Sequence, residues 1–360
     1  MRRKSIGDYL LLTLFSVGLV GALCASIDFA ASQNYLPALV GGRYVLVISF
    51  TALAVLFLSK SAHKLLRNHK KLKTIVFIIL CGLFVGTAIF LRCLVIQRIP
   101  IEPVEESLEN YTIGLSLLNG ETEQQYYALF PEKLGFPMLI LWPTFAIFGA
   151  SVRNALYANL VCSVISIFLA GHIARRIAGR TGALVAVALM SLWPSHILFS
   201  NMVATEPSFT MLILLAADMM TSILDRRKGS LYDAAPSRML GVMALLGIVL
   251  ALAGAIRPMA VILLAAYCVV QLCVTGDPMN EIRVEGARYA TSQPIVCIVL
   301  VMVCYLVTGS VINRAISDII GEQPASGLYA SGYNLMVGLN TQSNGLWNET
   351  DSEFFAQAYD

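Results

Sequence analysis

Residues 74–96 read TIVFIILCGLFVGTAIFLRCLVI, an apolar run in which Arg92 is the one charged side chain. About 20 consecutive apolar residues form a helix long enough to cross the hydrocarbon core of a bilayer. Comparable runs recur along the chain, and they predict nine helical spans at about 8–26, 43–59, 74–96, 154–174, 182–200, 207–224, 239–256, 259–275 and 293–312. The predicted fold class is all-α: a polytopic helical membrane protein with about nine transmembrane helices.

The composition of the whole chain indicates the same class. Hydrophobic residues make up 57% of the 360 residues and charged residues 13%, whereas soluble domains hold about 45–50% and about 25%. The mean hydropathy is +0.73. Lysine and arginine form no basic face interleaved with aromatic residues, so we expect no nucleic acid partner. The eight cysteines lie in or beside apolar runs without metal-binding spacing, so we expect small apolar side chains there and neither a metal nor a cofactor.

The distribution of positive charge predicts the topology. Of the 25 lysines and arginines, 18 fall in five short segments, at 1–7, 60–73, 175–181, 225–238 and 276–291. Because basic loops stay in the cytoplasm, we expect a multi-pass protein of the cell membrane with a cytoplasmic N-terminus and an extracytoplasmic C-terminus. The first apolar run follows basic residues and lacks a clear cleavage site, which is typical of a retained signal anchor.

Three regions follow from this topology. Residues 1–73 form an N-terminal two-span extension, 74–312 form the membrane core, and 313–360 form an extracytoplasmic C-terminal segment. The stretch 136–150 is proline-interrupted and too short to cross a bilayer. We therefore predict juxtamembrane helices within the first large outer loop, 97–153.

The outer loop carries the most informative charges. Acidic residues after Pro103 indicate the first turn of a helix that runs to about Leu118, where they complement the helix dipole. Lys133 is the single lysine in the predicted outer half, beside Glu132. A lone cation at this depth binds an anionic headgroup or a phosphate; the alternative is an interfacial lysine that extends its ammonium group into water.

Charges at the ends of later spans are further candidates. Glu206 and Arg257 lie at the predicted outer ends of spans. Ionisable residues at membrane depth are functional candidates by default; the alternative is that both charges face water at the corner between two spans. Asp218 lies deeper and would pair with an arginine or contact another helix. His172 and His196 lie near span ends, where we expect interfacial positions and not catalysis.

A series of short motifs follows the same order as in a known superfamily. The motifs are Glu106 with Tyr111 and 117–120, then 131–137, 147–149, 174–179, Trp193-Pro194, 205–207, Arg257-Pro258, 332–340 and 343–348. This order resembles the glycosyltransferase C superfamily, specifically the bacterial relatives of protein O-mannosyltransferases and of the lipid A aminoarabinose transferase. The resemblance covers about 74–360.

The resemblance implies a membrane glycosyltransferase of the cell envelope. Such an enzyme moves a hexosyl or pentosyl group, with inversion, from a polyprenyl-phosphate-linked donor to an extracytoplasmic glycan, lipid or protein acceptor, and it works in contact with membrane lipid. A carboxylate general base would take the acceptor's proton, and fixed cations would meet the phosphate's developing charge.

The roles that follow can be assigned residue by residue. The implied catalytic residues are Glu106 as base, Lys133 and Glu206; the implied substrate-binding residues are Tyr111, Glu132 as a partner that orients Lys133, Arg257 and Glu105. The family carries aspartate at the position matched to Glu106, and Glu105 remains an alternative register for the base.

Other functions remain open at the level of sequence. A transporter or flippase for lipid-linked sugars would use similar charges, although the chain shows no paired, related halves. A glycan polymerase or ligase and a catalytically inactive, truncated membrane scaffold are further alternatives.

Overall fold

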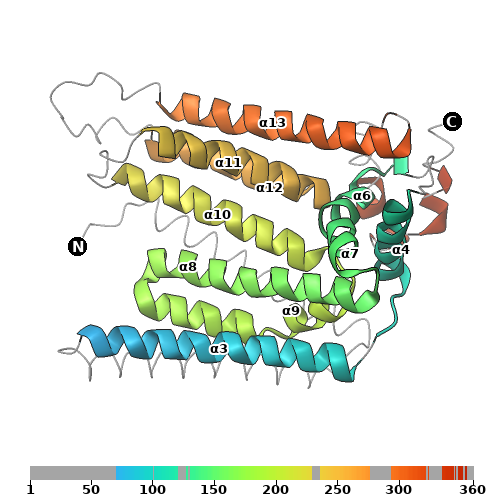
Figure 1. Cartoon of the computed structure of the whole chain (residues 1–360). Coiled ribbons are helices and arrows are strands. Elements are labelled where there is room, and N and C mark those ends of the chain that lie inside the picture. Colours follow the sequence, from blue (N-terminus) through green and yellow to red (C-terminus); the bar gives the residue numbers. More distant parts are fainter. Residues whose placement is uncertain are drawn as a thin grey trace. The chain divides into compact units, whose positions relative to one another are not determined.

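The computed structural model describes residues 70–99, 101–120, 127–128, 130–228, 236–275, 293–321, 323, 335–343, 345, 348–351 and 353–354. Every regular element in these ranges is a helix, which confirms the all-α class (Figure 1). The predicted spans 8–26 and 43–59, and the first three residues of the motif at 332–340, lie outside the described residues. Contacts divide the chain into two compact units, 1–79 and 80–360, and the packing described below belongs to the second.

The described elements follow one another in a fixed order along the chain. They are α3 (Lys70–Arg98), α4 (Glu105–Asn119), α6 (Glu132–Phe136), the π-helix η1 (Pro137–Leu141), α7 (Trp142–Phe148), α8 (Val152–Leu192), α9 (Pro194–Leu198), the 3₁₀ turn η2 (Phe199–Asn201), α10 (Glu206–Lys228), α11 (Pro236–Ile256), α12 (Ala260–Thr275) and α13 (Gln293–Ile320).

Three of the described helices are long and apolar enough to cross a membrane: Thr74–Arg98, Val152–Leu192 and Ile295–Ile320. Shorter apolar helices cover Leu240–Ile256 and Ala260–Leu272. The described part of the chain therefore holds three helices with the length and composition that a membrane span requires, and the predicted number of nine spans stays a prediction.

Helix α8 is two helices joined by a sharp turn. Gly179 has φ 69° and ψ −160°, a conformation that glycine adopts without the steric cost of a Cβ, and the two arms fold back beside each other (Figure 1). Gly171 permits their close approach, because a Cβ there would lie 2.6 Å from Cγ2 of Val187. The second arm ends at Leu192 and not near 200 as predicted, because Pro194 starts the separate helix α9.

The core lies where α8, α10, α11 and α13 pack together, with side chains such as Leu246, Leu250 and Val301 fully buried. Helices α11 and α13 approach each other closely at Gly247, where a Cβ would lie 2.5 Å from the carbonyl oxygen of Val301. Small residues at such contacts let membrane helices come within van der Waals range of each other. This packing fixes the ends of α10 and α11, where the candidate site lies.

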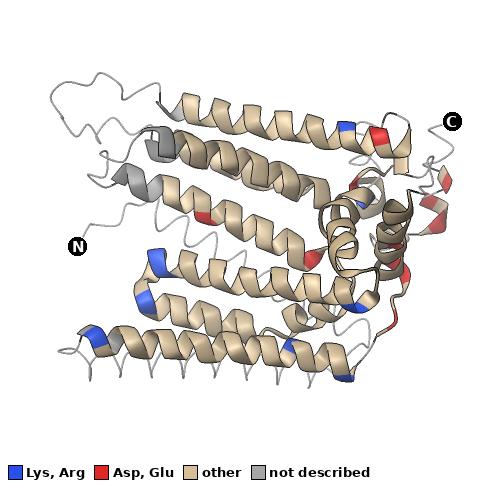
Figure 2. Ribbon diagram, viewed as in Figure 1, with Lys and Arg blue, Asp and Glu red and all other residues tan. Residues whose placement is uncertain are grey.

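The outer loop gathers at one end of this packed group. Helix α4 begins and ends where the sequence predicts, and Gly120 closes it with φ 74°. The predicted juxtamembrane stretch forms the short helices η1 and α7. Within the second unit, acidic residues gather at α4 and at the start of α10, whereas basic residues gather at the turn of α8 (Figure 2).

Candidate functional site

Helix α4 is anchored by its buried polar face. Ser107 Oγ accepts a hydrogen bond from the backbone N–H of Val203 (3.0 Å), and Asn110 Nδ2 donates to the carbonyl of the same residue (3.1 Å). From α8, Asn159 Nδ2 donates to the carbonyls on either side of Val203, at 2.7 and 3.1 Å. The segment 202–204 is not helical, and these side chains bind the backbone N–H of Val203 and all three carbonyl groups of the segment. It is therefore held between α4 and α8.

Lys133 pairs with a carboxylate of α4. Its Nζ lies 2.8 Å from Oε2 of Glu109, and the two side chains are 32% and 27% exposed. The sequence predicts Glu132 as the residue that orients Lys133, but the structure gives this ion pair to Glu109. Glu132 begins α6 and is partly buried. This burial raises the pKa of its carboxyl group, while the positive charge of Lys133 acts in the opposite direction.

A second ion pair joins α10 to the end of α11. Arg257 Nη2 donates to Oε1 of Glu206 at 2.5 Å, and Arg257 Nε donates to Oγ1 of Thr205 at 2.8 Å. The arginine and the glutamate are 32% and 30% exposed. The sequence places both at outer corners without pairing them. The pair keeps the guanidinium in one orientation at the edge of the packed helices.

The two ion pairs are connected through backbone contacts. Gly135 of α6 lies against the end of α11 so closely that a Cβ would be 1.8 Å from the carbonyl oxygen of Ala255. Lys133 and Arg257 each lie two residues from this contact. Helix α4 holds Val203, and Thr205 and Glu206, which follow it closely, are the partners of Arg257. The contacts therefore form a closed ring. We call this set, from α4 through Lys133, Gly135, Ala255 and Arg257 to 203–206, the outer ring.

The candidate base lies at the start of α4. Glu105 and Glu106 are exposed, and neither side chain makes a hydrogen bond or ion pair with the other described residues. Glu106 lies three residues before Glu109, so both project from neighbouring positions on one face of the helix. Glu105 has φ 48°, a left-handed conformation that costs a residue other than glycine about 1–3 kcal/mol.

Tyr111 lies one turn further along α4, and its ring meets that of Phe145 edge-on, with centroids 5.7 Å apart. The ring packs against the core, so its apolar part stabilises the attachment of α4 to α7. This contact is structural, and a role in binding substrate stays a prediction.

Two cavities open near the outer ring, and neither is lined by Glu106, Lys133, Glu206 or Arg257. The smaller, about 10 Å³, lies between 101–104 and 201–203 and has room for about one water molecule. The larger, about 390 Å³, is lined by Leu117, Gly120, Met138, Trp142, Asp318 and Ile319. The sequence does not single out Trp142 or Asp318, because nothing in their local spacing shows that α7 and α13 meet.

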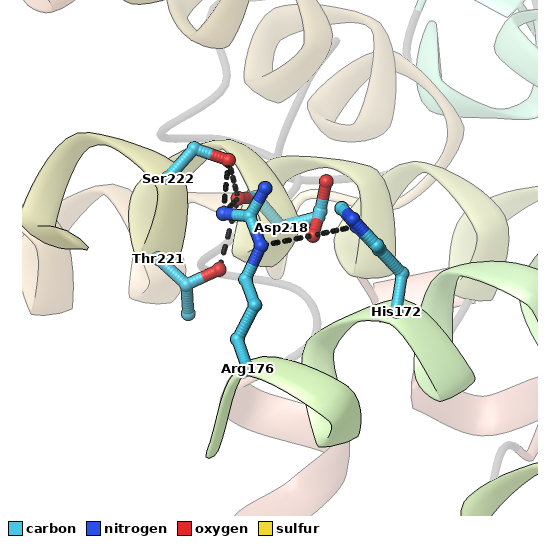
Figure 3. Close-up of polar contacts among 5 residues, drawn as sticks. All are labelled: His172, Arg176, Asp218, Thr221 and Ser222. Atoms are coloured by element: carbon cyan, nitrogen blue, oxygen red, sulfur yellow. Dashed lines mark hydrogen bonds and ion pairs between the residues drawn. The ribbon is translucent and has the colours of Figure 1, made fainter. Parts of the chain in front are cut away.

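A separate polar cluster lies towards the turn of α8 (Figure 3). Asp218 of α10, 15% exposed, has its Oδ1 2.7 Å from Nδ1 of His172 and 3.8 Å from Nε of Arg176. Arg176 also donates to the hydroxyl of Ser222. The sequence leaves open whether Asp218 pairs with an arginine or makes a polar contact to another helix, and the structure shows both, with Arg176 and with His172. The cluster joins α8 to α10 at the basic end of the second unit, far along α10 from Glu206.

Arg92 forms a third polar centre, which the sequence shows only as an interruption of an apolar run. Its side chain is fully buried, and its Nε donates to Oγ of Ser163 at 2.8 Å. One of its terminal nitrogens lies 3.0 Å from Nδ1 of His196, and the other donates to the carbonyl of Ser191. Arg92 therefore fastens α3 to α8 and α9, and so fixes the segment that leads into the outer ring.

The outer ring combines two kinds of chemistry. Lys133 and Arg257 are each held in place by a carboxylate. The oxygens of a phosphate could bind the same two side chains, the lysine as a point charge and the arginine through its planar guanidinium group. The exposed carboxylates at the start of α4 are free to accept a proton. Among the described residues, no group of three or more His, Cys, Asp or Glu side chains is placed to hold a metal ion.

Comparisons of the chain with protein-family models, with characterised proteins and with solved structures find no match in any of the three.

Proposed function

We propose that the chain is a glycosyltransferase of the cell membrane that transfers a sugar from a polyprenyl-phosphate-linked donor to an acceptor outside the cytoplasm. The proposal includes nine spans, a cytoplasmic N-terminus and an outward-facing site, and places the chain among the relatives of the glycosyltransferase C superfamily. The helices long enough to cross a membrane support the membrane setting, and the outer ring supports the chemistry.

The observation that carries the proposal is the connection of Lys133 and Arg257 through the contact between Gly135 and Ala255. It brings two cations, 124 positions apart in the sequence, onto adjoining elements beside exposed glutamates. A dianionic or monoanionic phosphate that leaves a sugar needs positive charge on more than one side, and pre-formed charge is worth most where water is excluded.

The transfer proceeds as a single displacement. The acceptor's oxygen or nitrogen attacks the anomeric carbon, and Glu106 takes the proton that the acceptor loses. The bond between that carbon and the phosphate oxygen breaks, its electron pair stays on the oxygen, and the configuration inverts. Lys133 and Arg257 neutralise the phosphate, exchanging Glu109 and Glu206 for its oxygens. Glu132 and Tyr111 keep α6 and α4 in place.

The test is transfer by the purified protein in nanodiscs, offered radiolabelled polyprenyl-phosphate sugars with hexosyl and pentosyl groups. We expect a product with the inverted anomeric configuration from at least one donor, and none from a Lys133→Ala and Arg257→Ala double variant. Movement of an intact donor across proteoliposomes without a new glycosidic bond would instead show a transporter.

A further inference from the structure

The larger cavity near the outer ring is a chemically distinct site. Its walls come from the end of α4, from η1 and α7, and from the last turns of α13. These elements pack firmly around it, since Ile312 and Ile316 of α13 are buried with Ile113 of α4 and Leu134 of α6. At about 390 Å³, it falls within the range of small-molecule sites, about 300–1,000 Å³.

The walls combine an aromatic face with a carboxylate. Trp142 is 47% exposed, and Asp318 is exposed in the last turn of α13. A negative charge there opposes the helix dipole, and Arg314, one turn earlier on α13, is also exposed. Asp318 has no side-chain hydrogen bond or ion pair with the other described residues. The carboxylate can therefore receive hydrogen bonds from a ligand.

The ligand must match both features. An indole ring takes an apolar face against it, and an ionised carboxylate accepts hydrogen bonds and donates none. A sugar ring offers a face of C–H groups and a rim of hydroxyl donors. An acyl or prenyl chain offers no donors, and a phosphate is repelled by Asp318. The cavity therefore suits a saccharide and not the donor's lipid carrier.

The position of the cavity excludes the sugar that is being transferred. Leu117 lies 11 residues after Glu106 on α4, which is about 16 Å along the helix axis. This is longer than one sugar ring. A saccharide held at Trp142 while another residue reacts at Glu106 must be extended, and binding of such remote parts is a known source of rate enhancement.

We infer that this cavity is an acceptor subsite, in which Trp142 and Asp318 bind a sugar residue of an extended glycan while a distant residue of the same glycan receives the transferred sugar. The inference deepens the proposed function and rests on it, because only the proposed transfer makes the bound saccharide an acceptor. It specifies the acceptor class as an oligosaccharide, and excludes single lipid headgroups and hydroxyl side chains of proteins.

Binding is tested without any transfer. The sequence holds three tryptophans, at 142, 193 and 347; a Trp193→Phe/Trp347→Phe variant leaves Trp142 as the sole tryptophan. In nanodiscs it is titrated with glucose and mannose oligomers of one to six residues. We expect quenching whose apparent Kd falls at least tenfold from the monosaccharide to the hexasaccharide, and a tenfold weakening by Asp318→Asn. Glu102→Gln, an exposed acid that lines the other cavity, should leave the Kd unchanged.

A matched pair of tryptophan variants provides a second test. Trp142→Ala should abolish hexasaccharide binding measured by calorimetry, whereas Trp193→Ala, 40% exposed at the start of α9, should not. Both should keep the monodisperse elution and thermal midpoint of the parent. Absence of binding by every oligomer, or equal loss with both tryptophan variants, would overturn the inference and leave Trp142 as an interfacial aromatic.

The transfer assay separates this inference from the proposed function. Asp318→Asn should raise KM for a hexasaccharide acceptor about tenfold and leave kcat/KM for a monosaccharide acceptor unchanged. Saccharide binding without transfer by the parent protein would refute the proposed function but not the cavity's ligand. Transfer that is insensitive to acceptor length and to Asp318→Asn would refute the subsite alone.

Discussion

Gly135→Ala is the change that acts most directly on the outer ring. A Cβ at this position would lie 1.8 Å from the carbonyl oxygen of Ala255, 2.4 Å from its carbonyl carbon and 3.0 Å from the nitrogen of Ile256. All three are backbone atoms, so no side-chain rotation relieves the clash. To reach ordinary van der Waals distance, α6 and α11 must separate by roughly 1.6 Å.

The expected consequences follow from that separation. Overpacking of this kind destabilises a protein by about 1–3 kcal/mol. The separation also moves Lys133 away from Arg257, and a misplacement of about 1 Å at a reacting centre costs about 100-fold in rate. We therefore expect a lower thermal midpoint and at least a 100-fold loss of sugar transfer in nanodiscs.

The matched control is Gly82→Ala in α3, where a Cβ would meet nothing within 4 Å. Alanine has the higher helix propensity, so this variant should keep its activity and its thermal midpoint. A Gly135→Ala protein with the stability and activity of the parent would show that α6 and α11 do not touch as described, and the connection between the two ion pairs would be lost.

Three further predictions concern the pH response, the start of α4 and the topology. Burial raises the pKa of the Glu132 carboxyl group above 4.5, so the folded state holds that proton more tightly than the unfolded chain, and stability falls as pH rises through the interval between the two pKa values. Glu132→Gln should therefore raise the thermal midpoint at pH 7, and this gain should shrink below pH 4.5. A gain that stays constant across pH would contradict this expectation. Glu105→Gly should relieve the left-handed conformation at φ 48° and stabilise the protein by up to about 1 kcal/mol, whereas a loss of stability in chemical denaturation would show that no strain is stored there. In a cysteine-free background, single cysteines at Asn119 and Ser343 should react with an impermeant maleimide from outside and one at Ser61 only after permeabilisation; labelling of Ser61 in intact cells would reverse the topology.

The sequence predicts the ends of α4 and the turn of α8, because both depend on residues that are close together in the chain. The acidic turn after Pro103 and the pair Asn119-Gly120 give both ends of α4, because dipole and cap interactions act within one turn. The basic turn at 175–181 falls where Gly179 reverses α8. These features need no knowledge of how distant helices pack.

Pairings between distant elements could not be predicted in the same way. The sequence assigns Glu132 to Lys133 because they are adjacent, but consecutive residues on a helix do not face each other. The actual partner, Glu109, is 24 residues away and is in reach only because α6 lies beside α4. Arg257 and Glu206, 51 residues apart, likewise require that α10 and α11 be neighbours. The cavity at Trp142 and Asp318 depends on the packing of four elements, α4, η1, α7 and α13, and leaves no local signal.

In the proposed mechanism, a carboxylate at the start of α4 acts as the base beside two phosphate-binding cations. The most direct measurement is single-turnover transfer of radiolabelled sugar by Glu106→Gln, with donor binding measured on the same sample and Glu105→Gln as the matched control. The substitution keeps the shape of the side chain and removes the base, so transfer should fall by about 100-fold or more while donor binding survives. Loss of transfer in Glu105→Gln alone would move the base by one residue, and full transfer by both variants would contradict the mechanism.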